Sequence, residues 1–286
     1  MNVRMWIHKA TQKNVNILKD FGYLFIGPEK GEMACGEYGE GKMSSPRQIF
    51  SFINKYFNKK NVVKTRNLKA LVTAGPTREY LDPVRYISNE SSGKQGYEIA
   101  EALTRLGIKT TLITGPTNLI SKKDIKTKKI ITANEMFEAV KKCLPVDIAV
   151  CAAAVADFKP VKKNKIKIKK NDVKLRTIEL EKNKDIVEFL SKNNKHRPSL
   201  VIGFAAETEN LSRNAFSKLK QKNCDLIVAN DVSKKDSGLN SDYNRVSIID
   251  NSGKIKVIKR NKKSFVANII AEIVLDKILI NDKSFN

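Results

Sequence analysis

From residue 68 onward, short apolar runs alternate with stretches whose apolar residues recur at helical spacing. The short runs predict strands at 70–73, 109–114, 147–152, 200–205 and 225–229, and the helical spacing predicts helices at 97–106, 134–142 and 211–222. This alternation is typical of an α/β fold, a mostly parallel sheet with helices on both faces. Ligands bind such sheets at the carboxyl ends of the strands, so the loops that follow the strands are the candidate functional segments.

The C-terminal stretch adds antiparallel strands and a final helix. The segments 245–250 and 254–259 flank Asn251, Ser252 and Gly253, which together are a hairpin signal. An apolar stripe at helical spacing covers 265–280 and predicts a helix that packs on the sheet.

The connection after the first predicted strand is unusually long, running from Gly75 to about Gly96. A structureless loop of this length usually binds something, although an irregular solvated loop is the alternative. Its residues favour a phosphorylated ligand through close backbone approach, helix capping and positive charge: Gly75, Gly93, Gly96, Ser91, Ser92, Arg78, Arg85 and Lys94. The loop matches neither G-x-G-x-x-G nor a Walker A motif.

Two later segments are also candidates for ligand binding. The third sheet strand continues into CAAAVADF, whose small residues permit close approach of a flat group and whose Asp157 could bind a hydroxyl or a metal. Its alternative is a tightly packed strand that ends in an exposed aspartate. In the stretch 165–169, isoleucine alternates with lysine, and Asn171 and Asp172 then give a turn. The apolar residues Val173, Leu175, Ile178 and Leu180 roughly return the pattern, which predicts a two-stranded arm able to fold over a phosphate site.

Composition limits the classes of function. The chain has 286 residues with 54 basic and 30 acidic side chains, a net charge of +24. Only 11 of the basic residues are arginine and no nucleic-acid recognition motif is present, which disfavours a nucleic-acid partner. No apolar run is long enough to span a membrane, and the four cysteines fit neither a zinc pattern nor a disulfide framework. We expect a cytoplasmic protein with reduced thiols.

The first 57 residues are predicted to form a separate unit, joined by a polar basic linker at 58–67 to a domain at 68–286. The unit is too small to bury a core alone, so we expect it to be the C-terminal remnant of a larger domain. Cys35 lies in its Gly-rich loop and is a candidate reactive thiol.

Six motifs in this order carry a specific resemblance: AGPTREYLDPVRYISNESSGKQG, CAAAVADF, KIKK, KNKDIV, GFAAET and LIVANDVS. Over about 67–286 the chain resembles phosphopantothenoylcysteine synthetase, the CTP-dependent phosphopantothenate–cysteine ligase of bacterial coenzyme A synthesis. The segments MNVRMW and ACGEYGEGKM resemble the end of the flavodoxin-like phosphopantothenoylcysteine decarboxylase that is fused ahead of this ligase in bifunctional enzymes. The resemblance implies a Rossmann-like ligase domain.

The resemblance also implies the chemistry. The carboxylate of 4′-phosphopantothenate attacks the α-phosphate of CTP, and cysteine then displaces CMP from the acyl cytidylate; Mg²⁺ offsets the phosphate charge. By their positions in the matching motifs, the residues implied to bind CTP are Cys151, Ala152, Ala153, Asp157, Lys167, Lys184, Asp185, Ile186, Val187, Phe204, Lys218 and Lys222. The metal ligands stay unassigned. Lys184 replaces a proline that the family usually has, which loosens that loop but keeps its charge.

Three catalytic residues are implied. Lys167 on the arm stabilises formation of the acyl cytidylate, with Lys165 as a rival for that role. Asn89 is implied to act on the carbonyl of the intermediate, and Arg85 is placed near Asn89. The family's ligase is a dimer whose subunits complete each other's sites, so a homodimer is implied.

For the decarboxylase segment, Asn2 matches a substrate-binding asparagine and Cys35 matches the proton donor. The flavin-binding units and the active-site histidine of that family have no counterpart in these residues. FMN is therefore expected only if a flavin-binding half is supplied, for instance by a separate chain.

Two other classes of protein are alternatives. A nicotinamide-dependent reductase could use the same architecture, but the expected G-x-G-x-x-G and an acidic end to the second strand are missing. A non-enzymatic scaffold would not need the lysine-rich arm.

Overall fold

The computed structural model describes residues 1–286 except 66, 170–176, 193–194, 234–237, 239–240 and 283–286. The chain divides into two units, Met1–Lys64 and Thr65–Asn286. The first contains α1 (Val3–Ile7), α2 (Lys9–Asp20), the antiparallel pair β1 (Glu29–Glu32) and β2 (Tyr38–Lys42), and most of α3 (Pro46–Thr65). Helix α3 continues through most of the predicted linker.

The second unit is built on an eight-stranded sheet with the order β14-β13-β12-β11-β8-β3-β6-β7. The strands from β12 to β7 in this order run parallel, and β13 and β14 are antiparallel. Their bounds are β3 (Lys69–Ala74), β6 (Lys109–Thr114), β7 (Lys126–Lys129), β8 (Ile148–Cys151), β11 (Leu200–Glu207), β12 (Leu226–Asp231), β13 (Tyr243–Asp250) and β14 (Ile255–Lys262). The predicted mostly parallel sheet is confirmed.

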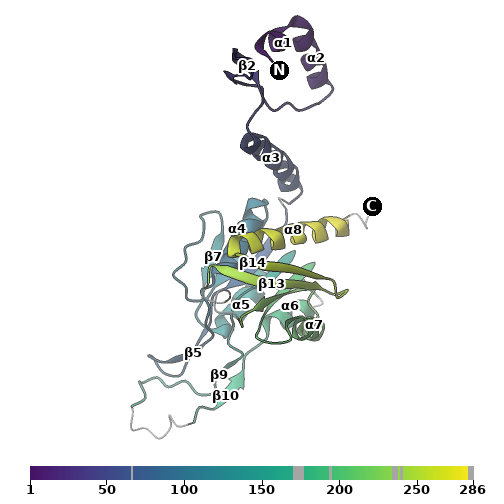
Figure 1. Ribbon diagram of the computed structural model, residues 1–286. Helices are drawn as coiled ribbons and strands as arrows, with labels where there is room; N and C mark the ends of the chain where they lie inside the picture. The colour runs from purple at the N-terminus through teal and green to yellow at the C-terminus, as the bar shows by residue number, and fades with distance from the viewer. Residues whose placement is uncertain (66, 170–176, 193–194, 234–237, 239–240, 283–286) are drawn as a thin grey trace. The chain divides into compact units, whose positions relative to one another are not determined.

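Helices cover both faces of this sheet (Figure 1). One face carries α4 (Lys94–Arg105) and α8 (Lys263–Asp282), whose Leu103 and Ile270 join one core cluster. The other carries α5 (Ala133–Cys143), α6 (Ile186–Lys192) and α7 (Leu211–Lys222), which contribute Val140, Leu190 and Leu219 to a second cluster. Strands buried on both faces need continuous apolar runs, and that is why the short runs alone located them.

The long loop after β3 contains structure that its sequence did not reveal. Strands β4 (Arg78–Tyr80) and β5 (Tyr86–Ser88) form a small antiparallel hairpin within it. The expectation of a structureless loop was therefore wrong. The buried Asp82 accepts the N–H groups of Val84 and Arg85 at 2.8 Å each and so closes the turn of the hairpin.

The arm also differs from the prediction. Its ladder joins β9 (Phe158–Pro160) to β10 (Leu180–Lys182), at the base of the arm. The described residues 161–169 contain no strand, and Ile166 is 81% exposed. Alternating isoleucines make a stable strand only where a surface buries one face, and nothing in the described part of the chain covers Ile166. The predicted turn at Asn171 and Asp172 lies outside the described residues.

Candidate functional site

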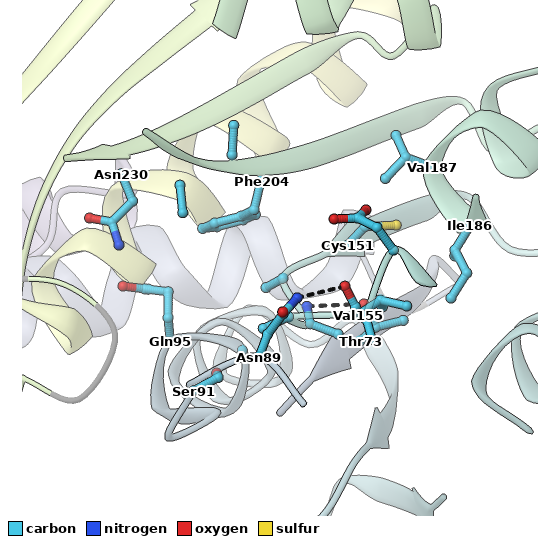
Figure 2. A pocket seen from close by; sticks show the side chains of 18 of the residues that line it. Thr73, Asn89, Ser91, Gln95, Cys151, Val155, Ile186, Val187, Phe204 and Asn230 are labelled. Carbon is cyan, nitrogen blue, oxygen red and sulfur yellow. Dashed lines mark hydrogen bonds between the residues drawn. The ribbon is translucent and has the colours of Figure 1, made fainter. Parts of the chain in front are cut away.

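A cavity of about 900 Å³ opens at the carboxyl ends of the central strands (Figure 2). Its lining includes Thr73 from β3, Cys151 from β8 and Phe204 from β11. Strand β3 lies between β6 and β8, so the chain leaves β3 to one side and later returns on the other. The cavity therefore lies at the topological switch point, where open α/β sheets bind their ligands.

The small residues after β8 form one wall of the cavity. The N–H groups of Ala152 and Ala153 donate to the carbonyl oxygen and Oγ1 of Thr73, at 3.2 and 3.3 Å. The N–H of Ala154 donates to the carbonyl of Gly75 at 2.9 Å. Because these N–H groups donate to the β3 side, the backbone groups that this wall can offer to a ligand are its carbonyl oxygens.

The loop after β3 lies beside this wall through two glycines in left-handed conformation. Gly75 and Gly93 have φ of 74° and 75°, and a Cβ on Gly93 would lie 3.1 Å from Gly75 Cα. Neither position accepts a side chain without strain. Asn89 Nδ2 donates to the carbonyl of Val155 at 2.9 Å and so ties the loop to the wall.

The loop leads directly into helix α4. Gly93 occupies the N-cap position without a side-chain cap. The two predicted serines lie just before it, where Ser91 Oγ accepts the N–H of Gly93 at 3.2 Å and Ser92 Oγ accepts that of Lys94 at 3.4 Å. The serines thus stabilise the start of the helix, beside the cavity that both of them line.

The candidate lysines of the cavity are paired with carboxylates. Lys218 Nζ lies 2.7 Å from Glu207, and Lys222 Nζ lies 3.0 Å from Asp185. An arriving triphosphate would have to compete with these carboxylates for the lysines. Lys184 lies over the ring of Phe137 at 4.7 Å, so the charge that replaces the usual proline contacts helix α5.

Cys151 is a structural member of the wall. Burial raises the pKa of its thiol to about 12. The thiolate is the reactive form of cysteine, so Cys151 is no nucleophile near neutral pH. Asp157, by contrast, is exposed at the cavity and makes no ion pair within the described residues.

Most of the predicted site residues line this cavity. Its lining contains Asn89, Cys151, Ala152, Ala153, Asp157, Lys184, Asp185, Ile186, Val187, Phe204, Lys218 and Lys222. Lys167 and Arg85 do not line it. Lys167 is exposed on the arm, and Arg85 points to the arm, where its Nη1 donates to Asp82 Oδ2 at 3.0 Å and to the carbonyl of Ile168 at 3.1 Å.

Sequence reasoning missed one end of the cavity. Gln95, Asn230, Asn244 and Lys263 line it there. Asn230 lies in the LIVANDVS motif, so a signal for it existed, whereas nothing in the local sequence distinguishes Lys263 from the neighbouring lysines.

The two candidates of the first unit lie at its surface. Asn2 is the N-cap of α1, where its side chain accepts the N–H of Met5 at 2.9 Å. Cys35 is exposed in the turn between β1 and β2.

The described residues contain no group of three His, Cys, Asp or Glu side chains able to hold a metal ion. None of their helices is both long and apolar enough to cross a membrane.

Comparison with known proteins gives two family matches. Residues 65–278 match the DNA/pantothenate metabolism flavoprotein C-terminal domain, and residues 1–58 match the Flavoprotein family. The coenzyme A biosynthesis bifunctional protein CoaBC of Haemophilus influenzae is 40% identical over 275 residues, which cover 96% of this chain and 68% of that protein. Its namesake in Escherichia coli strain K12 is 41% identical over 282 residues, or 98% of this chain and 68% of that protein.

A solved structure agrees with these matches. The crystal structure of the C-terminal domain of a CoaBC protein superposes with a TM-score of 0.64 at 35% identity, covering 78% of this chain and 99% of that one. The chain therefore belongs to the family of the coenzyme A biosynthesis bifunctional protein CoaBC, with the DNA/pantothenate metabolism flavoprotein C-terminal domain as its second unit.

Proposed function

We propose that this chain ligates 4′-phosphopantothenate to cysteine in coenzyme A biosynthesis, with CTP as the activating nucleotide. The observation that supports the proposal most is the gathering of the candidate residues from β8, β11, α6 and α7 in one cavity. In this reaction the carboxylate attacks the α-phosphate of CTP, so that pyrophosphate leaves and an acyl cytidylate forms. The amine of cysteine then attacks the acyl carbon, and CMP leaves as the amide forms.

The wall of small residues supports recognition of cytosine. The carbonyl oxygens of Ala152 and Ala153 are acceptors, which suit the exocyclic amine of cytosine and not the O4 atom of uracil. Such a site discriminates against the analogue that lacks the donor, because its acceptors would then stay unpaired. The aromatic ring of Phe204 provides an apolar surface in the same cavity.

Two side chains are assigned to the two half-reactions. Lys167 stabilises negative charge on the α-phosphate as the acyl cytidylate forms, and Asn89 acts on the carbonyl when cysteine attacks. Since Lys167 does not line the cavity of its own chain, we infer that it reaches the cavity of a second copy in a homodimer.

Mg²⁺ would be held mainly by the triphosphate. Mg²⁺ is usually bound through one or two carboxylates plus substrate phosphates, and the exposed Asp157 offers one such carboxylate. The ion supplies charge neutralisation at the phosphates. The described residues fit this arrangement and not a preformed cage, because they contain no cluster of metal ligands.

The test is incubation of the purified chain with phosphopantothenate, cysteine, Mg²⁺ and one of CTP, UTP, ATP or GTP. We expect cysteine-dependent release of CMP and formation of phosphopantothenoylcysteine, with CTP preferred. Absence of this product with every nucleotide would contradict the proposal, and oxidation of NADPH by the chain in a parallel assay would instead support the reductase alternative.

The first unit supports a second candidate function. Residues 1–58 match the Flavoprotein family, yet Val15 is the only hydrophobic residue of this unit buried among its described side chains. Phe21 and Tyr23 are 75% and 63% exposed. We infer that the unit contributes to decarboxylation, and holds FMN, only together with a flavin-binding half. The purified chain should therefore be colourless, and copurified FMN absorbance would refute this.

A further inference from the structure

A second cavity, of about 250 Å³, lies at the same edge of the sheet as the main cavity of about 900 Å³ described above. Thr114 and Lys129, the last residues of β6 and β7, line it together with Arg78 of β4 and Tyr97 of α4. None of its lining residues lines the main cavity. Because β3 lies between β8 and β6, the two cavities are on opposite sides of the end of β3. The proposed ligase reaction gives the second cavity no role.

Arg78 is the cavity residue whose hydrogen-bonding groups are least used. Its side chain is half-buried, and its Nε is buried without a hydrogen-bond partner in the described part of the chain. Its guanidinium lies over the ring of Tyr86 at 4.6 Å and forms no ion pair with a carboxylate of the described residues. A guanidinium has five N–H donors and no acceptor, and buried donors are nearly always paired. Arg78 therefore lacks an acceptor, which a bound anion would supply.

The charges around this cavity also favour an anion. The two carboxylates next to its lining residues along the chain are used elsewhere, since Glu79 Oε1 accepts the N–H of Ala133 at 2.8 Å and Glu135 Oε2 accepts that of Ile131 at 2.7 Å. Neither glutamate lines the cavity. Lys129 does line it, is exposed, and forms no ion pair among the described residues. The lining thus contains two cationic side chains and no anionic one, an arrangement that concentrates anions.

The remaining lining limits the size and kind of ligand. Tyr97 is only 6% exposed, and its hydroxyl lies 3.2 Å from Oγ1 of Thr117, so two hydroxyl groups are available beside the cations. Pro116 and Ile130 add apolar surface. The volume is below the range of about 300–1,000 Å³ that is usual for drug-sized ligands. A nucleotide is therefore too large, whereas inorganic phosphate or a carboxylate with a short apolar chain is small enough.

Thr117 connects the second cavity to the loop beside the main one. A Cβ on Gly75 or on Gly93 would lie 3.0 or 2.8 Å from Cγ2 of Thr117, so the methyl group of Thr117 occupies the space beside both glycines. Gly93 is the N-cap of α4. A ligand that contacts Thr117 therefore touches a residue that packs on this loop.

We propose that Arg78 and Lys129, with the hydroxyl groups of Tyr97 and Thr117, bind a small oxyanion, either phosphate or a short-chain carboxylate. The planar fork of a guanidinium matches the oxygen atoms of both groups, and the lysine adds a point charge. The site does not depend on the proposed ligase function, because none of its residues lines the main cavity.

Amide NMR titrations of the full chain with inorganic phosphate and, separately, with butyrate test the proposal. The signals of Thr117 and Ile130 report on the second cavity, and those of Ala152 and Ala153 report on the main cavity. At least one of the two anions should shift the Thr117 and Ile130 signals saturably, and the anion with the lower dissociation constant identifies the class of ligand. In Arg78→Met this dissociation constant should rise about ten- to hundredfold, the scale for loss of hydrogen bonds from a charged group.

The control is Lys128→Met, which removes the same charge from an exposed neighbour outside the lining and should leave the dissociation constant unchanged. Arg78→Lys keeps the charge without the fork and should bind with an intermediate constant. If circular dichroism shows that Arg78→Met is unfolded, Lys129→Met is titrated instead, with a rise expected from the same signals. The proposal is overturned if neither anion shifts the Thr117 and Ile130 signals saturably, if the folded variant binds as tightly as wild type, or if Lys128→Met weakens binding equally.

Discussion

The cavity and the arm serve the same proposed reaction, but they are positioned in different ways. Cys151 ends β8, where it pairs with Gly203, and Phe204 lies within β11, where it pairs with Val228, so the register of the sheet fixes both of these cavity residues. Lys167 lies in a stretch without secondary structure and is placed by a few contacts. In a parallel sheet the strand ends meet at one edge by geometry alone, whereas the position of an arm depends on individual hydrogen bonds to its neighbours.

Hydrogen bonds to the hairpin β4/β5 hold the arm, and the buried carboxylate of Asp82 accepts two of the hydrogen bonds at this contact. Asp82 Oδ2 accepts the N–H of Ile168 at 3.3 Å and Nη1 of Arg85 at 3.0 Å. The N–H of Asn164 donates to the carbonyl of Leu81 at 2.9 Å. Lys167 is therefore held on both sides along the chain, by residues of the hairpin β4/β5. The hairpin β4/β5 therefore helps to position the arm.

The largest effect is expected at Lys167. Lys167→Gln should slow pyrophosphate release by about 10²- to 10³-fold, the scale for loss of one charge-stabilising donor. Lys165→Gln should remain close to wild type in the same assay. If only Lys165→Gln is damaging, the assignment of the arm lysine is wrong.

A second prediction concerns Asn89, inside the cavity. Asn89→Asp should still release pyrophosphate but should pass the acyl cytidylate to cysteine about 10²-fold more slowly, because a donor to the carbonyl is lost. Mass spectrometry should then detect the trapped intermediate on the enzyme. A block before pyrophosphate release, as in Lys167→Gln, would remove the distinction between the two half-reactions.

Mixing these two variants tests whether the arm of one copy serves the cavity of another. If the arm of one copy serves the cavity of another, a mixed dimer of Lys167→Gln and Asn89→Asp contains one site with both wild-type residues. Activity should then return to a fraction of wild type after subunit exchange. No recovery in a proven mixed dimer would place Lys167 at its own chain's cavity.

A smaller effect is predicted when the hydrogen bonds that Asp82 accepts from the arm and from Arg85 are weakened. Asp82→Asn should lower the rate of pyrophosphate release roughly tenfold, because Lys167 is less well placed. In the Lys167→Gln background the same change should have little further effect, since the side chain it positions is already absent. Equal losses in both backgrounds would mean that Asp82 acts on overall stability and not on the arm.

Acid stability provides a second measurement on Asp82. Burial alone would raise the pKa of this carboxyl, but the N–H groups of Val84, Arg85 and Ile168 and the charge of Arg85 hold it below its ordinary value of 3.8. A lowered folded pKa stabilises the protein above the unfolded pKa, and this stabilisation is lost as pH falls through the folded pKa. Thermal melting below pH 4 should therefore depend less on pH in Asp82→Asn.

The sequence predicted the cavity better than the arm. Short apolar runs and helical stripes placed the strands and helices of the second unit, because a strand covered on both faces must be apolar. The alternation of Ile166 and Ile168 with lysine suggested a strand, but strand formation also needs a surface to pack on. The role of Asp82 and the burial of Lys263 depend on contacts between distant segments, which no local pattern records.

The smallest expected effect concerns the thiols. At pH 7.5 the exposed Cys35 should react with iodoacetamide, while Cys151, whose pKa burial raises to about 12, should not. Peptide mapping by mass spectrometry gives the extent of labelling at each cysteine. Rapid alkylation of Cys151 in the folded protein would show that this wall of the cavity opens to solvent.

The most direct test of the ligase follows one oxygen atom. Phosphopantothenate labelled with ¹⁸O in both carboxylate oxygens is converted in the presence of CTP, Mg²⁺ and cysteine. An acyl cytidylate transfers one carboxylate oxygen to the phosphate of CMP and leaves the other in the amide. Mass spectrometry should therefore find one ¹⁸O atom in each CMP formed, and unlabelled CMP would contradict the account.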